Sequence, residues 1–384
     1  MKLEHFHTID DLRQGANRRI PRLSFDYLDG GEGDETGLRL NRSAFNDVKL
    51  LPHYLRDVSQ RNLKVPLFGR QYDFPVGIPP IGLANFIWPG TDLILARLAK
   101  QQNIPYIISS AGTTKLEIIA AEIPDHAWFQ LYVSVDEKVT FDLVRRADAA
   151  GIKVLVVTVD IPIPAKRIRD LRNRFQLPFR LTPAMLMDIA TCPSWALATL
   201  RAGTPDFENM VPYGPPKSEN KSLAEYMATS STSMLDLDLM KKIRDAWSGT
   251  LVVKGVMSTE NAVAAIDLGA DGIIVSNHGG RQLASSPSTI EVLPAIKQAV
   301  GERATVMLDS GIRNGADIVK SICMGSDFTF SGRSFMYGVG AAGAPGAGRA
   351  FDILQDETDR TLAQIGCTDV NELGPDYVWR TPQP

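Results

Sequence analysis

The stretch DGIIVSNHGGRQ, residues 271–282, decides the fold class of this chain. An apolar, β-branched run ends in a histidine, two glycines and an arginine, which is typical of a buried parallel strand that presents polar side chains at its carboxyl end. The two glycines let the backbone turn or approach a ligand closely. A lone histidine after a strand is more often a hydrogen-bonded structural residue, so the rest of the chain has to decide between these interpretations.

The overall composition is that of an ordinary globular protein. The chain has 384 residues, 44% of them hydrophobic and 22% charged, with a formal net charge of −3. It lacks the basic excess of nucleic-acid-binding proteins, so we expect no nucleic acid partner. The length could hold two or three average domains, and it also allows one large barrel with insertions.

The cysteines and the apolar segments indicate the compartment. Cys192, Cys323 and Cys367 are widely spaced and odd in number, which predicts neither a disulfide framework nor a Cys-x-x-Cys metal site. We expect a cytoplasmic protein without a bound metal. Neither a secretory signal nor an uninterrupted apolar stretch of membrane-spanning length is found in the sequence.

Short β-rich runs alternate with amphipathic helical stretches, which predicts parallel βαβ units. The eight candidate strands are 75–81, 106–110, 128–133, 154–160, 251–255, 272–277, 305–310 and 328–332, the number that a (β/α)₈ TIM barrel requires. The predicted helices are 91–102 behind an N-cap Thr91, 136–150, 258–268, 314–324 and 349–365. We therefore predict an α/β protein with a single domain, made of a helical lead-in (1–74), a barrel (75–345) and a C-terminal helix and tail (346–384).

A long insertion interrupts this rhythm after the fourth strand. Residues 161–233 are far more than an ordinary βα loop needs and are rich in Pro, Ser, Asn and Met. The segment 181–200 combines Met, Leu, Ile and Trp with few charges, which fits a lid, an oligomer contact or a membrane-surface patch. The weak basicity favours a lid or an oligomer contact.

Nearly every predicted strand ends in a polar residue or a glycine. Because the active sites of such barrels lie at the carboxyl ends of the strands, these residues are candidates for a shared site. Each also has a structural alternative, since Ser and Thr cap helices, Asp160 could cap one and Lys254 could be a surface charge. The candidates are Gly82, Ser109, Gln130, Tyr132, Thr158, Asp160, Lys254, Ser276, His278, Asp309, Ser310 and Gly311.

Two features indicate anionic partners. Lys254 lies within an apolar strand, where an unpaired ammonium would be costly to bury, so a negative group is expected beside it. Arg313 and Arg333 follow the seventh and eighth strands with small residues, Gly311 and Gly332, beside them. Barrels commonly hold a phosphate at this position, which predicts a phosphorylated cofactor.

The sequence resembles the FMN-dependent 2-hydroxy acid oxidase and dehydrogenase family over nearly its full length. The resemblance is carried by FDY (25–27), NRSAF (41–45), WFQLY (128–132), TVD (158–160), RIRD (167–170), NRF (173–175), LVVKG (251–255), SNHGGRQL (276–283), DSGIR (309–313) and GR (332–333). The SNHGGRQ block is highly specific. The resemblance implies oxidation of an (S)-2-hydroxy acid to the 2-keto acid with FMN as cofactor.

The same resemblance assigns roles to the candidate residues. His278 is the expected base, Asp160 the carboxylate that orients its ring, and Arg281 the ligand of the substrate carboxylate. Tyr27 is expected to donate a second hydrogen bond to that carboxylate, and Arg167 to lie near the developing ketone and the carboxylate. Tyr132 is expected at the substrate hydroxyl and Lys254 at the N1 and O2 edge of the flavin. The sequence leaves open whether the α-hydrogen moves to the flavin directly as a hydride or through a carbanion, because His278 would serve as the base in either scheme. The residues expected to hold FMN are Pro80, Ile81, Gly82, Ser109, Gln130, Thr158, Lys254, Ser276, Asp309, Ser310, Gly311, Arg313, Gly332 and Arg333.

Departures from the commonest pattern inform the choice of substrate and acceptor. Gly82 stands where oxidases of the family typically carry Ala, and the surrounding sequence is most similar to the mandelate and lactate dehydrogenase branch, which favours a dehydrogenase. Ala111 stands where a bulkier residue occurs in glycolate oxidases, which predicts room for a larger substrate side chain. Quinone or oxygen is the expected electron acceptor, residues 177–215 are a candidate peripheral contact with the inner membrane, and a homotetramer is expected from the resemblance.

Two other function classes remain open on sequence grounds. One is a different FMN barrel chemistry without net oxidation, similar to a type 2 isopentenyl diphosphate isomerase. The other is a catalytically silent barrel that only binds. His278, Arg281 and Tyr27 together favour hydroxy acid oxidation over both.

Overall fold

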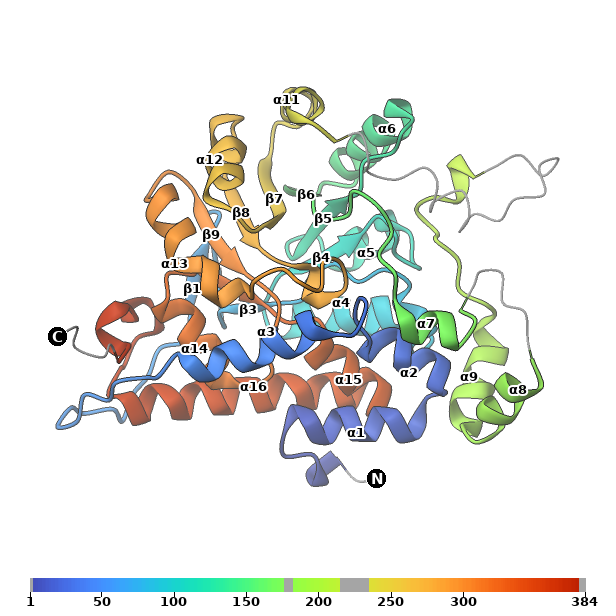
Figure 1. Ribbon diagram of the computed structural model, residues 1–384, viewed down its shortest axis with the longest axis horizontal. Helices are drawn as coiled ribbons and strands as arrows, with labels where there is room; N and C mark the ends of the chain where they lie inside the picture. The colour runs from blue at the N-terminus through green and yellow to red at the C-terminus, as the bar shows by residue number, and fades with distance from the viewer. Residues whose placement is uncertain (1–2, 176–181, 215–234, 380–384) are drawn as a thin grey trace.

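A closed barrel of parallel strands forms the centre of the molecule. The computed structural model describes residues 3–175, 182–214 and 235–379. Eight parallel strands pair in the order β3-β10-β9-β8-β7-β6-β5-β4, and a bridge between Ile78 and Tyr106 brings the two ends of the sheet together. Figure 1 shows the helices around the outside of these strands. The predicted (β/α)₈ barrel is confirmed.

Each predicted strand coincides with a barrel strand, but several end earlier than predicted. The predicted segment 272–277 ends at Val275 and 154–160 ends at Thr158, because the last residues leave the sheet to enter the site. The strands are β3 (Val76–Gly77), β4 (Tyr106–Ser109), β5 (Ala127–Leu131), β6 (Val154–Thr158), β7 (Thr250–Val256), β8 (Gly272–Val275), β9 (Thr305–Leu308) and β10 (Phe328–Phe330).

Polar side chains cap the N-termini of several helices between the strands. Asp136, Ser258 and Asn314, the first residues of three predicted helical stretches, are N-caps, and the side chain of each accepts a backbone N–H of the first turn. Thr91 was predicted as an N-cap, which is wrong: Gly90 precedes the helix in a left-handed conformation and Thr91 is its first residue. The helices are α4 (Thr91–Gln101), α5 (Leu116–Glu122), α6 (Glu137–Ala149), α11 (Leu237–Ala246), α12 (Thr259–Asp267), α13 (Thr289–Val300) and α14 (Gly315–Cys323).

The lead-in is helical as predicted, but it also contains a hairpin that was not predicted. The two short antiparallel strands β1 (Val65–Leu67) and β2 (Arg70–Tyr72) pack into the cluster that fills the barrel, where Phe68 lies 5.6 Å from Trp128 between ring centroids. The hairpin therefore covers the amino end of the barrel. The lead-in helices are α1 (Ile9–Arg19), α2 (Arg22–Asp29) and α3 (Thr36–Asp47).

Two further groups of helices complete the molecule. α15 (Arg333–Ala342) packs against α1 and against α16 (Ala344–Ile365), along the lower edge of Figure 1. The predicted final helix, 349–365, begins five residues earlier than expected, because the Gly- and Ala-rich segment before it is helical too. The described part of the insertion forms α7 (Ile168–Arg172), α8 (Pro183–Ala190) and α9 (Pro193–Ala202).

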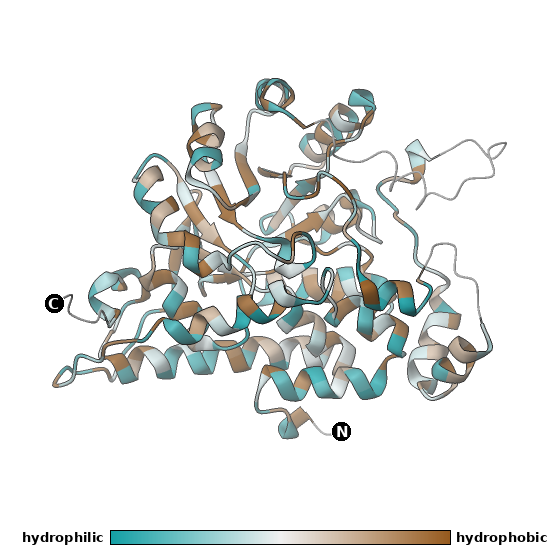
Figure 2. Cartoon of the chain, in the orientation of Figure 1, coloured by the Kyte–Doolittle hydropathy of each residue, from teal (hydrophilic) through white to brown (hydrophobic). Residues whose placement is uncertain are grey.

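The strands alternate between two apolar clusters. Val156, Val252 and Ile274 belong with Trp128 and Phe330, while their neighbours Leu155, Val253 and Ile273 pack with the helices. Trp128 and Phe330 touch at 5.7 Å between ring centroids although their strands are not adjacent, so this contact crosses the barrel interior. Figure 2 shows the strands as mainly hydrophobic and the outer helix faces as mainly hydrophilic.

Candidate active site

The polar residues predicted at the strand ends continue the interior-facing register of the barrel. Side chains alternate between faces along a strand, so a residue two positions after an interior residue faces the interior as well. Thr158 follows Val156, Lys254 follows Val252 and Ser276 follows Ile274 in this way. Ser109, Gln130 and Asp309 stand in the same relation to Ile107, Trp128 and Met307. The alternation thus brings six polar side chains together at one end of the barrel.

His278 and Asp160 meet at this end. The imidazole Nδ1 lies 2.9 Å from Asp160 Oδ1, and the two side chains are largely enclosed, with 21% and 11% of their surface exposed. Burial acts to raise the pKa of Asp160, but the nearby His278 and Lys254 hold it below its usual value. Because Nδ1 is engaged by a carboxylate, Nε2 is the ring nitrogen left for chemistry.

A bulge in β7 makes room for this pair. The pairing of β7 with β8 shifts between Lys254 and Val256, and Gly255 has a φ of +103°. A Cβ added to Gly255 would lie 2.6 Å from the Cβ of Asp160 and 2.9 Å from its backbone nitrogen. Glycine is therefore required here both for its backbone conformation and for the close approach of Asp160.

Arg281 is held against the lead-in helix α2. Its Nη1 donates to the carbonyl oxygens of Tyr27, at 2.6 Å, and Gly30, at 3.1 Å, and its guanidinium lies over the Tyr27 ring at 5.0 Å. Arg167 lies over the same ring at 5.6 Å and pairs with Asp170 at 3.4 Å. Burial, together with the charge of Arg167, lowers the pKa of Arg281 to about 9. This excess of positive charge favours an anionic ligand.

Two tyrosines add hydroxyl groups to the site at the carboxyl end of the barrel. Tyr27 stacks on Phe175 at 5.0 Å between ring centroids, and its hydroxyl lies 3.4 Å from the Gly82 carbonyl oxygen. Burial and the charge of Asp160 raise the pKa of Tyr132 well above its usual value. Tyr132 therefore stays protonated at neutral pH, so its hydroxyl can donate a hydrogen bond.

Lys254 is buried and has an anionic partner, as the sequence predicted. Its Nζ donates to Ser276 Oγ at 2.8 Å and lies 3.2 Å from Asp309 Oδ2. Burial acts to lower the pKa of Lys254, but Asp309 and Asp160 raise it above its usual value. The ammonium is therefore charged. Asp309, which the resemblance assigned to the cofactor, also balances this lysine.

Two arginines lie further along the same cavity. Arg313 donates from Nη1 to its neighbour Ile312 at 2.7 Å, and Arg333 donates to three carbonyl oxygens, those of Leu28, Gly279 and Gly30, at 2.8–3.0 Å. Burial lowers the pKa of Arg313 to about 10 and also lowers that of Arg333. Within the described chain no carboxylate pairs with either guanidinium, so a phosphate suits both.

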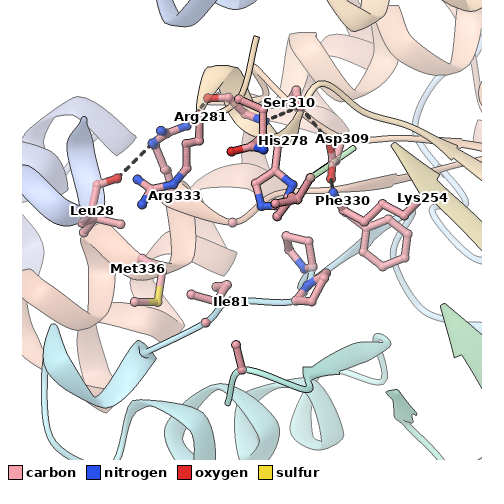
Figure 3. Close-up of a pocket in the computed structure, with 18 of the residues that line it drawn as sticks. Leu28, Ile81, Lys254, His278, Arg281, Asp309, Ser310, Phe330, Arg333 and Met336 are labelled. Atoms are coloured by element: carbon pink, nitrogen blue, oxygen red, sulfur yellow. Dashed lines mark hydrogen bonds and ion pairs between the residues drawn. The ribbon is translucent and has the colours of Figure 1, made fainter. Parts of the chain in front are cut away.

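One cavity of about 340 Å³ joins these groups, and Figure 3 shows part of its lining. Arg281 and Arg333 lie on one side of the view and Lys254 with Asp309 on the other, with His278 between them. The predicted site residues that line the cavity are Tyr27, Pro80, Ile81, Gly82, Tyr132, Arg167, Lys254, His278, Arg281, Asp309, Ser310, Gly311, Arg313, Gly332 and Arg333. The others, Ser109, Gln130, Thr158, Asp160 and Ser276, lie just behind the lining.

Atoms behind the lining test whether a flavin suits this cavity. Gln130 Nε2 and Thr158 Oγ1 are buried and have no hydrogen-bond partner among the described residues. Buried polar atoms are normally satisfied, so donors in this position indicate a polar ligand. A flavin offers carbonyl and ring-nitrogen acceptors at one end and a phosphate at the other. These orphaned groups, the buried Lys254 and the two arginines fit that pattern.

Several lining residues were missed by the sequence reasoning. Ile87, Phe207 and Met336 add apolar side chains to the lining, which also includes Ala111, and Ile161 lies at the start of the insertion. Their apolar side chains carry no chemical signal, and Phe207 comes from an insertion without a recognisable pattern. Only the fold shows that they belong to the site.

Comparisons with known proteins identify the family. The model of the FMN-dependent dehydrogenase family matches residues 16–380. (S)-mandelate dehydrogenase of Pseudomonas putida is 37% identical over 378 residues, covering 98% of this chain and 94% of that protein. L-lactate dehydrogenase of Pseudomonas syringae pv. syringae is 35% identical over 364 residues, covering 94% and 96%.

Solved structures agree with the sequence comparison. A crystal structure of the monotopic membrane protein (S)-mandelate dehydrogenase has a TM-score of 0.93 at 36% identity, covering 98% of this chain and all of that one. A crystal structure of mandelate oxidase has a TM-score of 0.81 at 33% identity, covering 95% and 96%. The isomerase-like and binding-only alternatives are not favoured by any of these relatives. Sequence, fold and site together show that this chain belongs to the FMN-dependent dehydrogenase family.

Proposed function

We propose that this protein oxidises an (S)-2-hydroxy acid to the corresponding 2-keto acid with FMN as its cofactor. The observation that carries this proposal is that His278, backed by Asp160, and Arg281 line one cavity. Its relatives include enzymes named for mandelate and lactate, both of which are 2-hydroxy acids. When bound, FMN supplies the oxidising power by accepting two electrons from the substrate.

One group of residues binds the substrate, and the His278–Asp160 pair accepts its proton. Arg281, Tyr27 and Arg167 bind the substrate carboxylate, since a planar guanidinium can bind a carboxylate through two parallel hydrogen bonds. Tyr132 donates to the substrate hydroxyl oxygen. His278 takes a proton at Nε2, and Asp160 stabilises the imidazolium that forms. This role of His278 is the same whether the α-hydrogen leaves as a hydride or as a proton.

The remaining residues hold the cofactor. Lys254 places positive charge at the flavin edge that becomes negative on reduction, which stabilises the reduced ring. Arg313 and Arg333 bind the phosphate, beside Gly311 and Gly332. The backbone of Pro80, Ile81 and Gly82 faces the ring, and Ser109, Gln130, Thr158, Ser276, Asp309 and Ser310 bind its polar edge and ribityl chain.

The apolar wall favours a substrate with a bulky apolar side chain. Ile87, Ala111 and Phe207 line the same cavity as the proposed carboxylate clamp of Arg281, Tyr27 and Arg167. Ala111 leaves space that a larger residue would fill, and a Cβ on Gly82 would approach its Cβ at 3.3 Å. Such a wall favours an aromatic or branched side chain over the bare CH₂ of glycolate.

We propose a quinone as the electron acceptor, with the enzyme bound peripherally to a membrane through α8 and α9. These helices expose Met187 (74%) and Leu200 (82%), and a relative is described as a monotopic membrane protein. Trp195 anchors the pair, because its buried indole Nε1 donates to the Ile87 carbonyl oxygen at 3.0 Å. Among the described helices, none has the length and apolar character of a membrane span. A homotetramer is part of this proposal, supported by family resemblance alone.

Anaerobic stopped-flow spectroscopy tests the proposed reaction. The FMN absorbance should bleach with (S)-lactate, (S)-mandelate or a longer (S)-2-hydroxy acid and stay unchanged with the (R) enantiomers. His278→Ala should retain FMN but lose bleaching by several orders of magnitude. Reoxidation by a soluble quinone should outpace reoxidation by oxygen. Normal bleaching in the His278→Ala protein would refute the role of the base, and bleaching by none of the acids would refute the reaction.

A further inference from the structure

Ser310 has a backbone conformation that its residue type disfavours. It directly follows Asp309 in the turn after β9 and has a φ of +75°, in the left-handed region. A side chain with a Cβ is disfavoured there, whereas glycine is not. A non-glycine residue persists in such a conformation when the surrounding contacts demand it.

The hydroxyl of Ser310 provides those contacts. Ser310 Oγ accepts the backbone N–H of Gly279 at 2.9 Å and donates to Asp309 Oδ1 at 2.7 Å. Ser310 is buried, with 8% of its surface exposed, so water competes little for either bond. One hydroxyl thus joins the turn that carries His278 to the carboxylate of Asp309.

These two bonds close a ring of interactions around the site. The other oxygen of Asp309 lies 3.2 Å from Lys254 Nζ, which donates to Ser276 Oγ at 2.8 Å. The same Ser276 Oγ accepts the backbone N–H of His278 at 3.1 Å. The backbone on both sides of His278 is therefore held by serine hydroxyls that also contact the Lys254–Asp309 pair. Figure 3 shows Ser310 between Asp309 and the His278 turn.

We infer that Ser310 is a positioning residue. It determines how strongly the positive charge of Lys254 stabilises the reduced flavin, and it fixes the turn that carries His278. A hydrogen bond donated to Asp309 draws part of the carboxylate's negative charge away from Lys254. Without that bond, Asp309 neutralises more of the ammonium charge. The reduced, anionic flavin then loses stabilisation, and the midpoint potential of the bound FMN falls.

The inference rests on the proposed placement of FMN beside Lys254, and two substitutions of Ser310 separate charge from strain. Ser310→Ala removes the hydroxyl and keeps a Cβ at positive φ, whereas Ser310→Gly removes the hydroxyl and relieves the conformation. The midpoint potential is measured on the FMN-loaded proteins by equilibration with redox dyes, and the melting temperature by circular dichroism. Ser326→Ala is the matched control, since it removes another buried hydroxyl, bonded to the Phe328 carbonyl oxygen.

Both Ser310 variants should lower the potential by a similar amount although Ser310→Gly melts at a higher temperature than Ser310→Ala. We expect a shift equivalent to a tenfold change in the reduction equilibrium, which is about 30 mV for a two-electron couple. Ser326→Ala should leave the potential unchanged. An unchanged potential in both Ser310 variants, a shift in Ser310→Ala alone, or an equal shift in Ser326→Ala would each overturn the inference.

Lys254→Met separates failure of this inference from failure of the proposed function. If it lowers the potential while the Ser310 variants do not, the placement of FMN stands and the role of Ser310 falls. If Lys254→Met leaves the potential unchanged, the proposed placement of FMN falls, and the inference falls with it. Lys254→Arg, which keeps the charge but moves it, replaces Lys254→Met if that protein does not retain FMN.

Discussion

His278 Nδ1 lies 2.9 Å from Asp160 Oδ1 although the two residues are 118 positions apart in the sequence. They come from the turns after β8 and β6, which are separated in the sheet by β7 alone. The bulge at Gly255 in β7 is what lets these turns approach each other. The distance between His278 and Asp160 therefore depends on β7, the strand that lies between them.

Replacing Asp160 with Asn tests the charge of this pair. The Asn amide oxygen can still accept a hydrogen bond from Nδ1–H, but without the negative charge it does not stabilise an imidazolium, so anaerobic flavin reduction by substrate should slow by two to four orders of magnitude. FMN content should stay normal, because Asp160 lies behind the cavity lining. Stopped-flow bleaching measures the rate, and reduction at the native rate would show that the carboxylate charge is not used.

Gly255→Ala tests the bulge. The added Cβ would meet backbone and side-chain atoms of Asp160 and would strain a residue at positive φ, so we expect slower flavin reduction and a melting temperature lower by several degrees. Gly348→Ala is the control, because a Cβ at this position in α16 meets nothing within 4 Å and alanine favours the helix. It should be as active as the native protein and melt at the same or a higher temperature. Equal behaviour of the two variants would contradict this account.

The fold was predictable because the apolar residues of the sequence follow the patterns of buried strands and of amphipathic helices in turn. Runs such as 154–160 and 272–277 read as buried strands, and the helices between them carry caps such as Ser258 and Asn314. The Val65–Tyr72 hairpin was missed because its strands are only three residues each, too short for a periodic pattern.

The polar half of the site was predictable for a related reason. Residues such as Lys254 and His278 stand at strand ends, where their chemistry is conspicuous in an otherwise apolar context. The apolar wall was not, because Phe207 and Ile87 look like ordinary core residues until the chain is folded. The positive φ of Ser310 was equally invisible, since serine gives no sign of it.

Ala111→Leu tests the size of the substrate pocket. A longer side chain at Ala111 would extend into the wall formed with Ile87 and Phe207, so it should exclude bulky side chains before small ones. We expect kcat/KM for (S)-mandelate to fall at least tenfold relative to that for glycolate, which corresponds to about 1.4 kcal/mol of differential binding. Equal losses for both acids would place the substrate side chain elsewhere.

The double substitution Met187→Glu and Leu200→Glu tests the proposed membrane contact. Two added charges on the exposed faces of α8 and α9 should abolish sedimentation with phospholipid vesicles, because charged groups are costly to bury among acyl chains. Flavin reduction by substrate should not change. Leu55→Glu, at a fully exposed leucine in the lead-in, should leave vesicle binding intact. Undiminished binding of the double variant would rule out this surface.

Asp29→Asn tests a buried charge network that ties the lead-in to the insertion. The Asp29 carboxylate accepts hydrogen bonds from Arg13 at 2.6 Å, Tyr337 at 2.7 Å and Arg169 at 2.8 Å. Burial acts to raise the pKa of Asp29, but these three partners together hold it well below its usual value. Loss of the carboxylate removes the buried partner that Arg13 and Arg169 share, although Arg169 keeps Glu35 at 2.6 Å and Arg13 keeps Asp10 at 3.7 Å. The change should cost about 3 kcal/mol of folding stability at pH 7.

The pH dependence of that loss has a definite sign. A carboxyl group whose pKa is lower in the folded state than in the unfolded chain stabilises the fold above its unfolded value, near 3.9, and less as the pH falls through its folded pKa. The difference in free energy of unfolding between native protein and Asp29→Asn should therefore be constant from pH 6 to 8 and shrink below about pH 4. Urea denaturation at several pH values measures it. A difference that stays constant down to pH 3 would mean that the lost stability comes from packing and not from the charge of Asp29.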